Sequence, residues 1–250
     1  MPVEYEKRAY KNASFDYEEY MNSLLYDVLE NYPSREEYLA EIVIPFLKSV
    51  CPKGAKVVPV FADRNVGPKN NNNERMKTIC ATDGDEYVVP DFLIVPEEYS
   101  YENPVKPLVM IETKKPLILN LGEDRPAYKD VLKALESSNQ MKEEIKAEIK
   151  ACGTLIFTDC ITWAFLSLKD GKIVEDDEYD TIRLLSIHKT DYVNSEKKRK
   201  WPGYKIAGAK YEEGEELEDY KEGTVGYDGW DKLRDQIWDL VSEKKSDQSM

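Results

Sequence analysis

The feature that most constrains the fold is a pair of apolar runs near the middle of the chain, Tyr87–Val95 and Leu108–Thr113. Both runs are rich in Val, Ile, Leu and other large apolar residues, which is typical of strands buried in a sheet. Each also carries an acidic residue, Asp91 in the first run and Glu112 near the end of the second. If the two runs pair as a β-hairpin, these two carboxyl groups lie side by side on neighbouring strands.

A helix is expected after Pro33, ahead of these runs. Ser34 is a suitable N-cap, and Glu37 lies three residues further on, which is the spacing of a capping box. Apolar residues then recur at helical spacing over 39–50. Pro45 falls inside this pattern and is expected to kink the helix.

Similar patterns predict the remaining elements and indicate a mixed α/β fold. The asparagine-rich stretch 67–75 cannot pack into a core and is expected to be a loop. The other predictions are a helical pattern at 24–29, a strand at 57–61, a long helix at 126–151 ended by Gly153, strands at 154–158, 161–168 and 181–187, a hairpin turn at 169–172, and a last helix at 230–241.

This order divides the chain into three parts. Residues 1–33 are a polar, tyrosine-rich N-terminal extension with helical character. Residues 34–189 hold the predicted α/β core. Residues 190–250 form a charged C-terminal extension, with a basic run, an acidic run and the terminal helix.

Charge and composition exclude several classes of protein. The chain has 49 acidic and 35 basic side chains, a net charge of −14, which argues against a nucleic-acid coat protein and against a basic membrane-surface helix. No run approaches the roughly 18 apolar residues that a membrane span needs. Four scattered cysteines without a CxxC pair indicate reduced thiols in a cytoplasmic protein.

The histidine content limits the kinds of catalytic site. His188 is the single histidine of the chain, which nearly excludes a histidine-rich metal site or a Ser-His-Asp triad. Any metal must therefore be held by carboxylates, and these favour a hard cation such as Mg²⁺ or Mn²⁺.

One group of residues combines these features. Asp91 and Glu112 supply two carboxylates, and Lys114 is two residues beyond Glu112, so the pleat of a strand places both side chains on the same face. Two carboxylates can hold Mg²⁺, which lowers the pKa of a bound water and neutralises charge on a phosphate. A nearby lysine can orient the water and stabilise the transition state. This chemistry suits hydrolysis of a phosphodiester bond by an activated water.

The pattern resembles that of the PD-(D/E)XK nuclease superfamily, with Pro90-Asp91 as PD and Glu112-Thr113-Lys114 as ExK. The resemblance implies a restriction-endonuclease-like fold, a mixed β-sheet flanked by helices. It implies that Asp91, Glu112 and the main-chain carbonyl of Thr113 hold the metal and that Lys114 is catalytic. It further implies a glutamate on the preceding helix, for which Glu37 or Glu41 is the candidate; Glu37 is slightly favoured, although a capping role is equally consistent with it.

A narrower similarity is to the N-terminal nuclease domain of type I restriction enzyme motor subunits and their stand-alone relatives. Those proteins carry a glutamine on the helix after ExK, for which Gln140 is the match and a catalytic candidate, followed by a strand like 155–166. Two positions depart from their pattern. Glu144 stands where an aromatic residue is expected, and Cys160 replaces the glycine after Thr158-Asp159.

The expected function is therefore a nuclease dependent on Mg²⁺ or Mn²⁺, for which DNA is favoured over RNA as the substrate while both stay open. The net charge of −14 keeps two alternatives open. A strongly acidic protein binds duplex DNA poorly unless its cations cluster, so the chain could instead be a non-catalytic binding or assembly module that retains the nuclease fold. It could also be a nuclease subunit that depends on a basic protein partner.

Overall fold

The computed structural model describes the parts of the chain that form the sheet and the helices packed on it. Its described residues are 15–24, 39–60, 88–100, 102–103, 105–114, 132, 135, 138–160, 162–186, 205–206 and 227–248. No helix in these ranges is long and apolar enough to cross a membrane.

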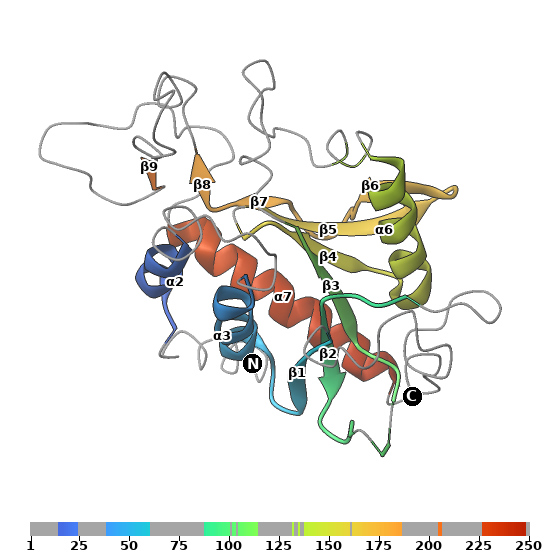
Figure 1. Ribbon diagram of the computed structural model, residues 1–250. Coiled ribbons are helices and arrows are strands. Elements are labelled where there is room, and N and C mark those ends of the chain that lie inside the picture. The colour runs from blue at the N-terminus through green and yellow to red at the C-terminus, as the bar shows by residue number, and fades with distance from the viewer. Residues whose placement is uncertain are drawn as a thin grey trace, which may run out of the picture.

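A mixed β-sheet forms the centre of the molecule (Figure 1). Six strands follow one another across it in chain order, and β3 and β4 are the one parallel pair among them. The strands are β1 (Ala55–Pro59), β2 (Phe92–Pro96), β3 (Val109–Thr113), β4 (Leu155–Thr158), β5 (Thr162–Lys169) and β6 (Lys172–Glu175), while β7 (Ile182–Arg183) pairs with β5. A separate two-stranded sheet joins β8 (Leu185–Ser186) to β9 (Lys205–Ile206).

The connections follow from the pairing. Strands β5 and β6 form a tight hairpin, in which Asp170 and Gly171 both have positive φ angles, 52° and 72°. Two consecutive left-handed residues are the hallmark of the type I′ turn, so the predicted turn at 169–172 is confirmed. The parallel pair β3–β4 instead needs a crossover, and α6 (Asn139–Cys152) lies on that connection.

Helices cover both faces of the sheet. Strand residues alternate between two hydrophobic cores, so that Ile111 packs into one and Met110 into the other. The first core also receives α2 (Tyr17–Ser23), α3 (Ala40–Val50) and α7 (Tyr227–Gln248), whereas the second receives α6 (Figure 1). The segments at both ends of the described chain therefore pack directly onto the central sheet.

Most of the predicted strands are confirmed to within a residue or two, and two of the strand predictions need correction. The run at 87–95 becomes a strand only from Phe92, so Asp91 lies immediately before β2 rather than inside it. The run at 181–187 yields two short strands in different sheets. The predicted capping box at 34–37 lies outside the described residues.

The long helix predicted at 126–151 is also wrong in its extent. Ser138 has an extended backbone (φ −136°, ψ 107°), and its side-chain oxygen accepts a hydrogen bond from the Met141 amide at 3.3 Å. Ser138 is therefore the N-cap of α6: the backbone of a capping residue is not helical, and its side chain accepts a hydrogen bond from a free amide of the first turn. Gly153 ends the helix with φ 90°, as the sequence indicated.

A buried aromatic group anchors α2 to the sheet beside the end of β4. The Tyr20 hydroxyl donates to the carbonyl oxygen of Cys160 at 2.7 Å and accepts from the indole nitrogen of Trp163 at 3.0 Å. Cys160 has φ 66°, a left-handed conformation that favours glycine. The hydrogen bond from Tyr20 and one from the Cys160 amide to Thr158 Oγ1 (2.9 Å) hold this turn.

We predict that Tyr20→Phe lowers the free energy of unfolding by about 1–3 kcal/mol, because it leaves two buried polar groups without their partner. Urea denaturation measures the change. The control is Tyr179→Phe, whose hydroxyl donates to Glu243 at 3.0 Å in an exposed contact, and which is expected to change stability by no more than about 0.5 kcal/mol. Equal effects of the two variants would contradict the buried role of Tyr20.

Candidate metal and phosphate site

The pairing of β2 with β3 brings the two predicted carboxylates together. The strands are antiparallel, with Phe92 opposite Ile111, and one further step along the ladder places Asp91 opposite Glu112. Asp91 Oδ2 accepts a hydrogen bond from the Thr113 amide at 2.8 Å and another from the Thr113 hydroxyl. The expectation that these side chains lie next to each other is therefore confirmed.

Lys114 lies on the same face of the sheet as Glu112. Its main-chain amide donates to the carbonyl of Thr158 on β4 at 2.9 Å, which continues the strand pairing beyond β3. Its ammonium group forms an ion pair with Glu112 Oε1 and lies 3.5 Å from Glu144 Oε2 on α6. The two-residue spacing thus works as the pleat predicts, and the shared face is the one that α6 covers.

Helix α6 adds two carboxylates that the motif did not indicate. Glu144 and Glu148 are four residues apart and share one side of the helix. Glu144 is 45% exposed, whereas Glu148 is only 1% exposed. Neither oxygen of Glu148 has a hydrogen-bond partner among the described residues, and the same holds for Glu112 Oε2. A buried carboxyl group without a partner is rare in a folded protein and calls for an explanation.

Burial dominates the electrostatics of this cluster. It raises the pKa of Asp91 against the opposing hydrogen bonds from Thr113. Burial, with repulsion from Asp91, raises the pKa of Glu112 to about 8. Burial, with repulsion from Glu112 and Glu144, raises the pKa of Glu148 to about 10. The cluster therefore holds more carboxyl groups than it can keep ionised at neutral pH.

Lys114 is the cation of this cluster. Its burial works against the charged form, but attraction to Glu112 and Glu144 outweighs this and raises its pKa. The ammonium group therefore stays charged at neutral pH, as a group that is to stabilise negative charge must.

The other candidates from the sequence are not joined to the cluster. Gln140 is exposed in the first turn of α6, one turn before Glu144. Glu41 is exposed on α3, whose apolar side packs into the core on the opposite face of the sheet. Glu37 lies outside the described residues. The additional glutamates near Asp91 and Glu112 therefore come from α6, not from the first-helix residue Glu41.

A charge-pattern signal for these glutamates was present in the sequence. Residues 140, 144 and 148 follow at intervals of four, and Ile145 and Ile149 mark the adjacent buried side of the same helix. The pattern places the three polar side chains on one flank. It does not say that this flank meets β3, because that depends on how α6 packs on the sheet.

The donor atoms suit a hard divalent cation. Asp91, Glu112 and the Thr113 carbonyl offer oxygen ligands, and the unpartnered Glu112 Oε2 is a free ligand atom. Within the described ranges, no three acidic, cysteine or histidine side chains are arranged to hold a metal ion together. A Mg²⁺ or Mn²⁺ ion here would therefore take its remaining ligands from main-chain and water oxygens, as Mg²⁺ commonly does.

Comparison with known proteins adds no relative to this description. No family model, curated protein or solved structure matches the chain. Function is therefore inferred from the arrangement of Asp91, Glu112, Lys114 and the α6 glutamates.

We predict that the protein loses stability as the pH rises from 5 to 8. In this window the folded state keeps protons on Glu112 and Glu148 that the unfolded chain releases. For each proton that the folded state keeps and the unfolded chain releases, the free energy of unfolding falls by about 1.4 kcal/mol for every unit by which the pH rises. Glu148→Gln removes one of the two, so the slope of stability against pH should fall by about half.

Urea denaturation across this pH range measures both slopes. The matched control is Glu143→Gln, an exposed residue of the same helix, which should leave the slope unchanged. A Glu148→Gln variant with the slope of the unaltered protein would show that Glu148 is ionised in the folded state.

Proposed function

We propose that this protein is a metal-dependent nuclease that hydrolyses phosphodiester bonds in DNA, with Mg²⁺ or Mn²⁺ at Asp91 and Glu112. One observation carries the proposal. The carboxyl groups of Asp91, just before β2, and Glu112 on the adjacent antiparallel β3 lie together, one oxygen of Glu112 is buried without a partner among the described residues, and Lys114 contacts the same glutamate. This combination supplies metal ligands and a cation at one place.

The order of the elements supports the resemblance to the PD-(D/E)XK superfamily. Helix α3 precedes the antiparallel strands β1, β2 and β3, and α6 then leads into β4, which is parallel to β3. Helices lie on both faces of the resulting mixed sheet. A restriction-endonuclease-like domain of this superfamily is expected to have this arrangement around its PD and ExK residues.

The roles of the side chains follow from their chemistry. Asp91 and Glu112 would bind the cation, together with the carbonyl oxygen of Thr113. When bound, the ion would lower the pKa of a coordinated water and neutralise charge on the phosphate. Lys114 would stabilise the negative charge that builds on the phosphoryl oxygens. Because Glu144 lies 3.5 Å from the Lys114 ammonium group, an incoming phosphate would compete with Glu144 for Lys114.

The net charge of the protein bears on how it would bind DNA, and the contacts of Lys114 bear on a second candidate function. With a net charge of −14, binding to a nucleic acid should be weak and strongly dependent on salt. A basic protein partner would supply the missing positive surface. The contacts of Lys114 with two glutamates favour the second candidate function, a non-catalytic module that retains the fold, because carboxyl groups already occupy the positions beside the ammonium group that a phosphate would take.

We predict cleavage of plasmid or single-stranded DNA by the purified protein in Mg²⁺ or Mn²⁺. Lys114→Ala should lower the rate by about 10²–10³-fold, the usual cost of removing one group that stabilises a transition state. Asp91→Ala should reduce activity at least as far. The control is Lys48→Ala, an exposed lysine on α3, which should retain activity. Cleavage that survives both site variants would exclude this site, and RNA in place of DNA tests the substrate.

Metal binding separates the nuclease from the non-catalytic module. We predict that the unaltered protein binds Mn²⁺, measured by electron paramagnetic resonance of the free ion, and that Glu112→Gln weakens this binding by about tenfold or more. Glu41→Gln is the matched control, since Glu41 is exposed on α3. A folded protein that neither binds Mn²⁺ nor cleaves DNA, alone or with a basic partner, would favour the non-catalytic module.

A further inference from the structure

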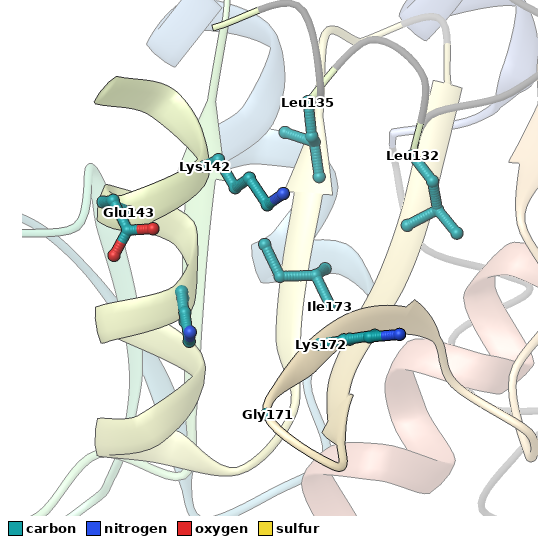
Figure 2. Close-up of a pocket in the computed structure, with 8 residues that line it drawn as sticks. Leu132, Leu135, Lys142, Glu143, Gly171, Lys172 and Ile173 are labelled. Carbon is teal, nitrogen blue, oxygen red and sulfur yellow. The ribbon is translucent and has the colours of Figure 1, made fainter. Parts of the chain in front are cut away.

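A second candidate site lies on the other flank of α6. A cavity of about 470 Å³ opens between this helix and the β5–β6 hairpin. Its apolar lining consists of Leu132, Leu135 and Ile173 (Figure 2). Leu135 is fully buried, whereas Leu132 and Ile173 are half-buried. Sites for small molecules typically have volumes of about 300–1,000 Å³ and an apolar lining with a few polar groups, so this cavity has the size and character of a ligand site.

Three lysines surround this apolar lining. Lys142 and Lys146 come from α6, and Lys172 comes from the start of β6. Figure 2 shows Lys142 reaching towards Leu135 and Ile173. None of the three ammonium groups forms an ion pair with a carboxylate among the described residues.

The surroundings make this group of lysines unusual. The chain as a whole carries a net charge of −14, so acidic partners are plentiful. Among the described residues, the carboxylate in the cavity lining is Glu143, which Figure 2 shows on the opposite edge of α6 from Lys142. The lining thus has three positive charges against one negative charge. An anion bound in this cavity would be attracted by the ammonium groups of its lining.

The charge pattern of α6 separates this cavity from the acidic cluster. Like charges four residues apart destabilise an isolated helix, yet α6 places Lys142 and Lys146 at this spacing. Lys142 and Lys146 lie on one flank, Glu144 and Glu148 on the other, and the buried side of the helix lies between them. Opposite charges at this spacing would have stabilised the helix. The arrangement instead gives the helix one flank of lysines and one flank of glutamates.

We propose that this cavity binds a phosphorylated ligand of about nucleotide size, with its phosphate between Lys142, Lys146 and Lys172 and its apolar part against Leu132 and Ile173. A phosphate carries enough charge and enough oxygen acceptors for several ammonium groups at once. A bare inorganic anion would make no favourable contact with the apolar lining, so the ligand is expected to carry an apolar part as well. The proposal goes beyond the nuclease site and does not depend on it, because it involves none of the same side chains.

Calorimetric titration of the purified full-length protein tests this inference. The probes are a purine nucleoside monophosphate, its unphosphorylated nucleoside, inorganic phosphate and a ten-nucleotide single strand. Titrations are made without divalent cation and at two salt concentrations. We expect the monophosphate to bind more tightly than either the nucleoside or inorganic phosphate, and its affinity to fall as salt rises.

Variants that are expected to change the affinity for the monophosphate in opposite directions identify the site. The double variant Lys142→Gln and Lys172→Gln should weaken binding of the monophosphate by about tenfold or more, since two charge-assisted contacts are lost. Glu143→Gln should tighten it, because the carboxylate of the lining repels the phosphate. The control is Lys169→Gln on the same hairpin, whose ammonium group already pairs with Asp177 at 3.4 Å, and it should bind as the unaltered protein does.

Some binding results would overturn the proposal, and others would support it and identify the ligand. Equal binding by the double variant and the Lys169→Gln control would overturn the proposal, and so would inorganic phosphate that binds as tightly as the nucleotide. Tighter binding of the ten-nucleotide strand than of the monophosphate, lost in the double variant, would support the site and identify its ligand as part of a nucleic acid. Glu112→Gln is expected to keep the binding, so loss of the metal site and loss of this cavity can be told apart.

Discussion

The antiparallel pairing of β2 with β3 is the interaction on which the candidate site depends. Because side chains alternate along a strand, a slip of one residue would turn a side chain to the other face of the sheet. The apolar residues of both strands prevent such a slip. Phe92 and Ile111 pack together into one core, and Leu93 and Met110 pack into the other. Two separate cores therefore enforce one register, and that register places Asp91 beside Glu112.

Helix α6 relates the two candidate sites to each other. Its apolar side packs on β3, β4 and β5, and its two flanks lie at the two candidate sites. One flank brings Glu144 close to Lys114, while the other lines the cavity beside the β5–β6 hairpin. The helix is not optimised for its own stability, because Lys142 and Lys146 are like charges four residues apart. This cost is consistent with residues placed for binding, since functional sites commonly contain groups that destabilise the fold.

The acidic cluster illustrates the same conflict between stability and binding. Glu148 and one oxygen of Glu112 are buried without hydrogen-bond partners in the described structure. Burial raises the pKa of both carboxyl groups and favours their protonated forms, even though Lys114 contacts Glu112. A divalent cation would offer an alternative source of positive charge. Proton release and metal binding would then be linked, because carboxylates must lose their protons to act as ligands.

Much of the site could be predicted because it depends on local rules. The apolar runs identify the strands, and the two-residue period of a strand places Glu112 and Lys114 on one face, as their ion pair confirms. The type I′ turn at Asp170-Gly171 is likewise a local property of its residues. The start of α6 was missed, although Ser138 is a good N-cap, because the helical pattern on both sides of it runs on without a break.

The sequence by itself determined most strands of the main sheet, the turn at 169–172 and the set Asp91, Glu112 and Lys114, since these follow from periodicity and from the chemistry of neighbouring residues. Only the tertiary structure decided that Glu148 is buried near that set, that Glu41 belongs to the other face, and that lysines from α6 and β6 line one cavity. The reason is physical. A sequence pattern shows which residues share a side of a helix, but the packing of both cores determines which strand that side meets.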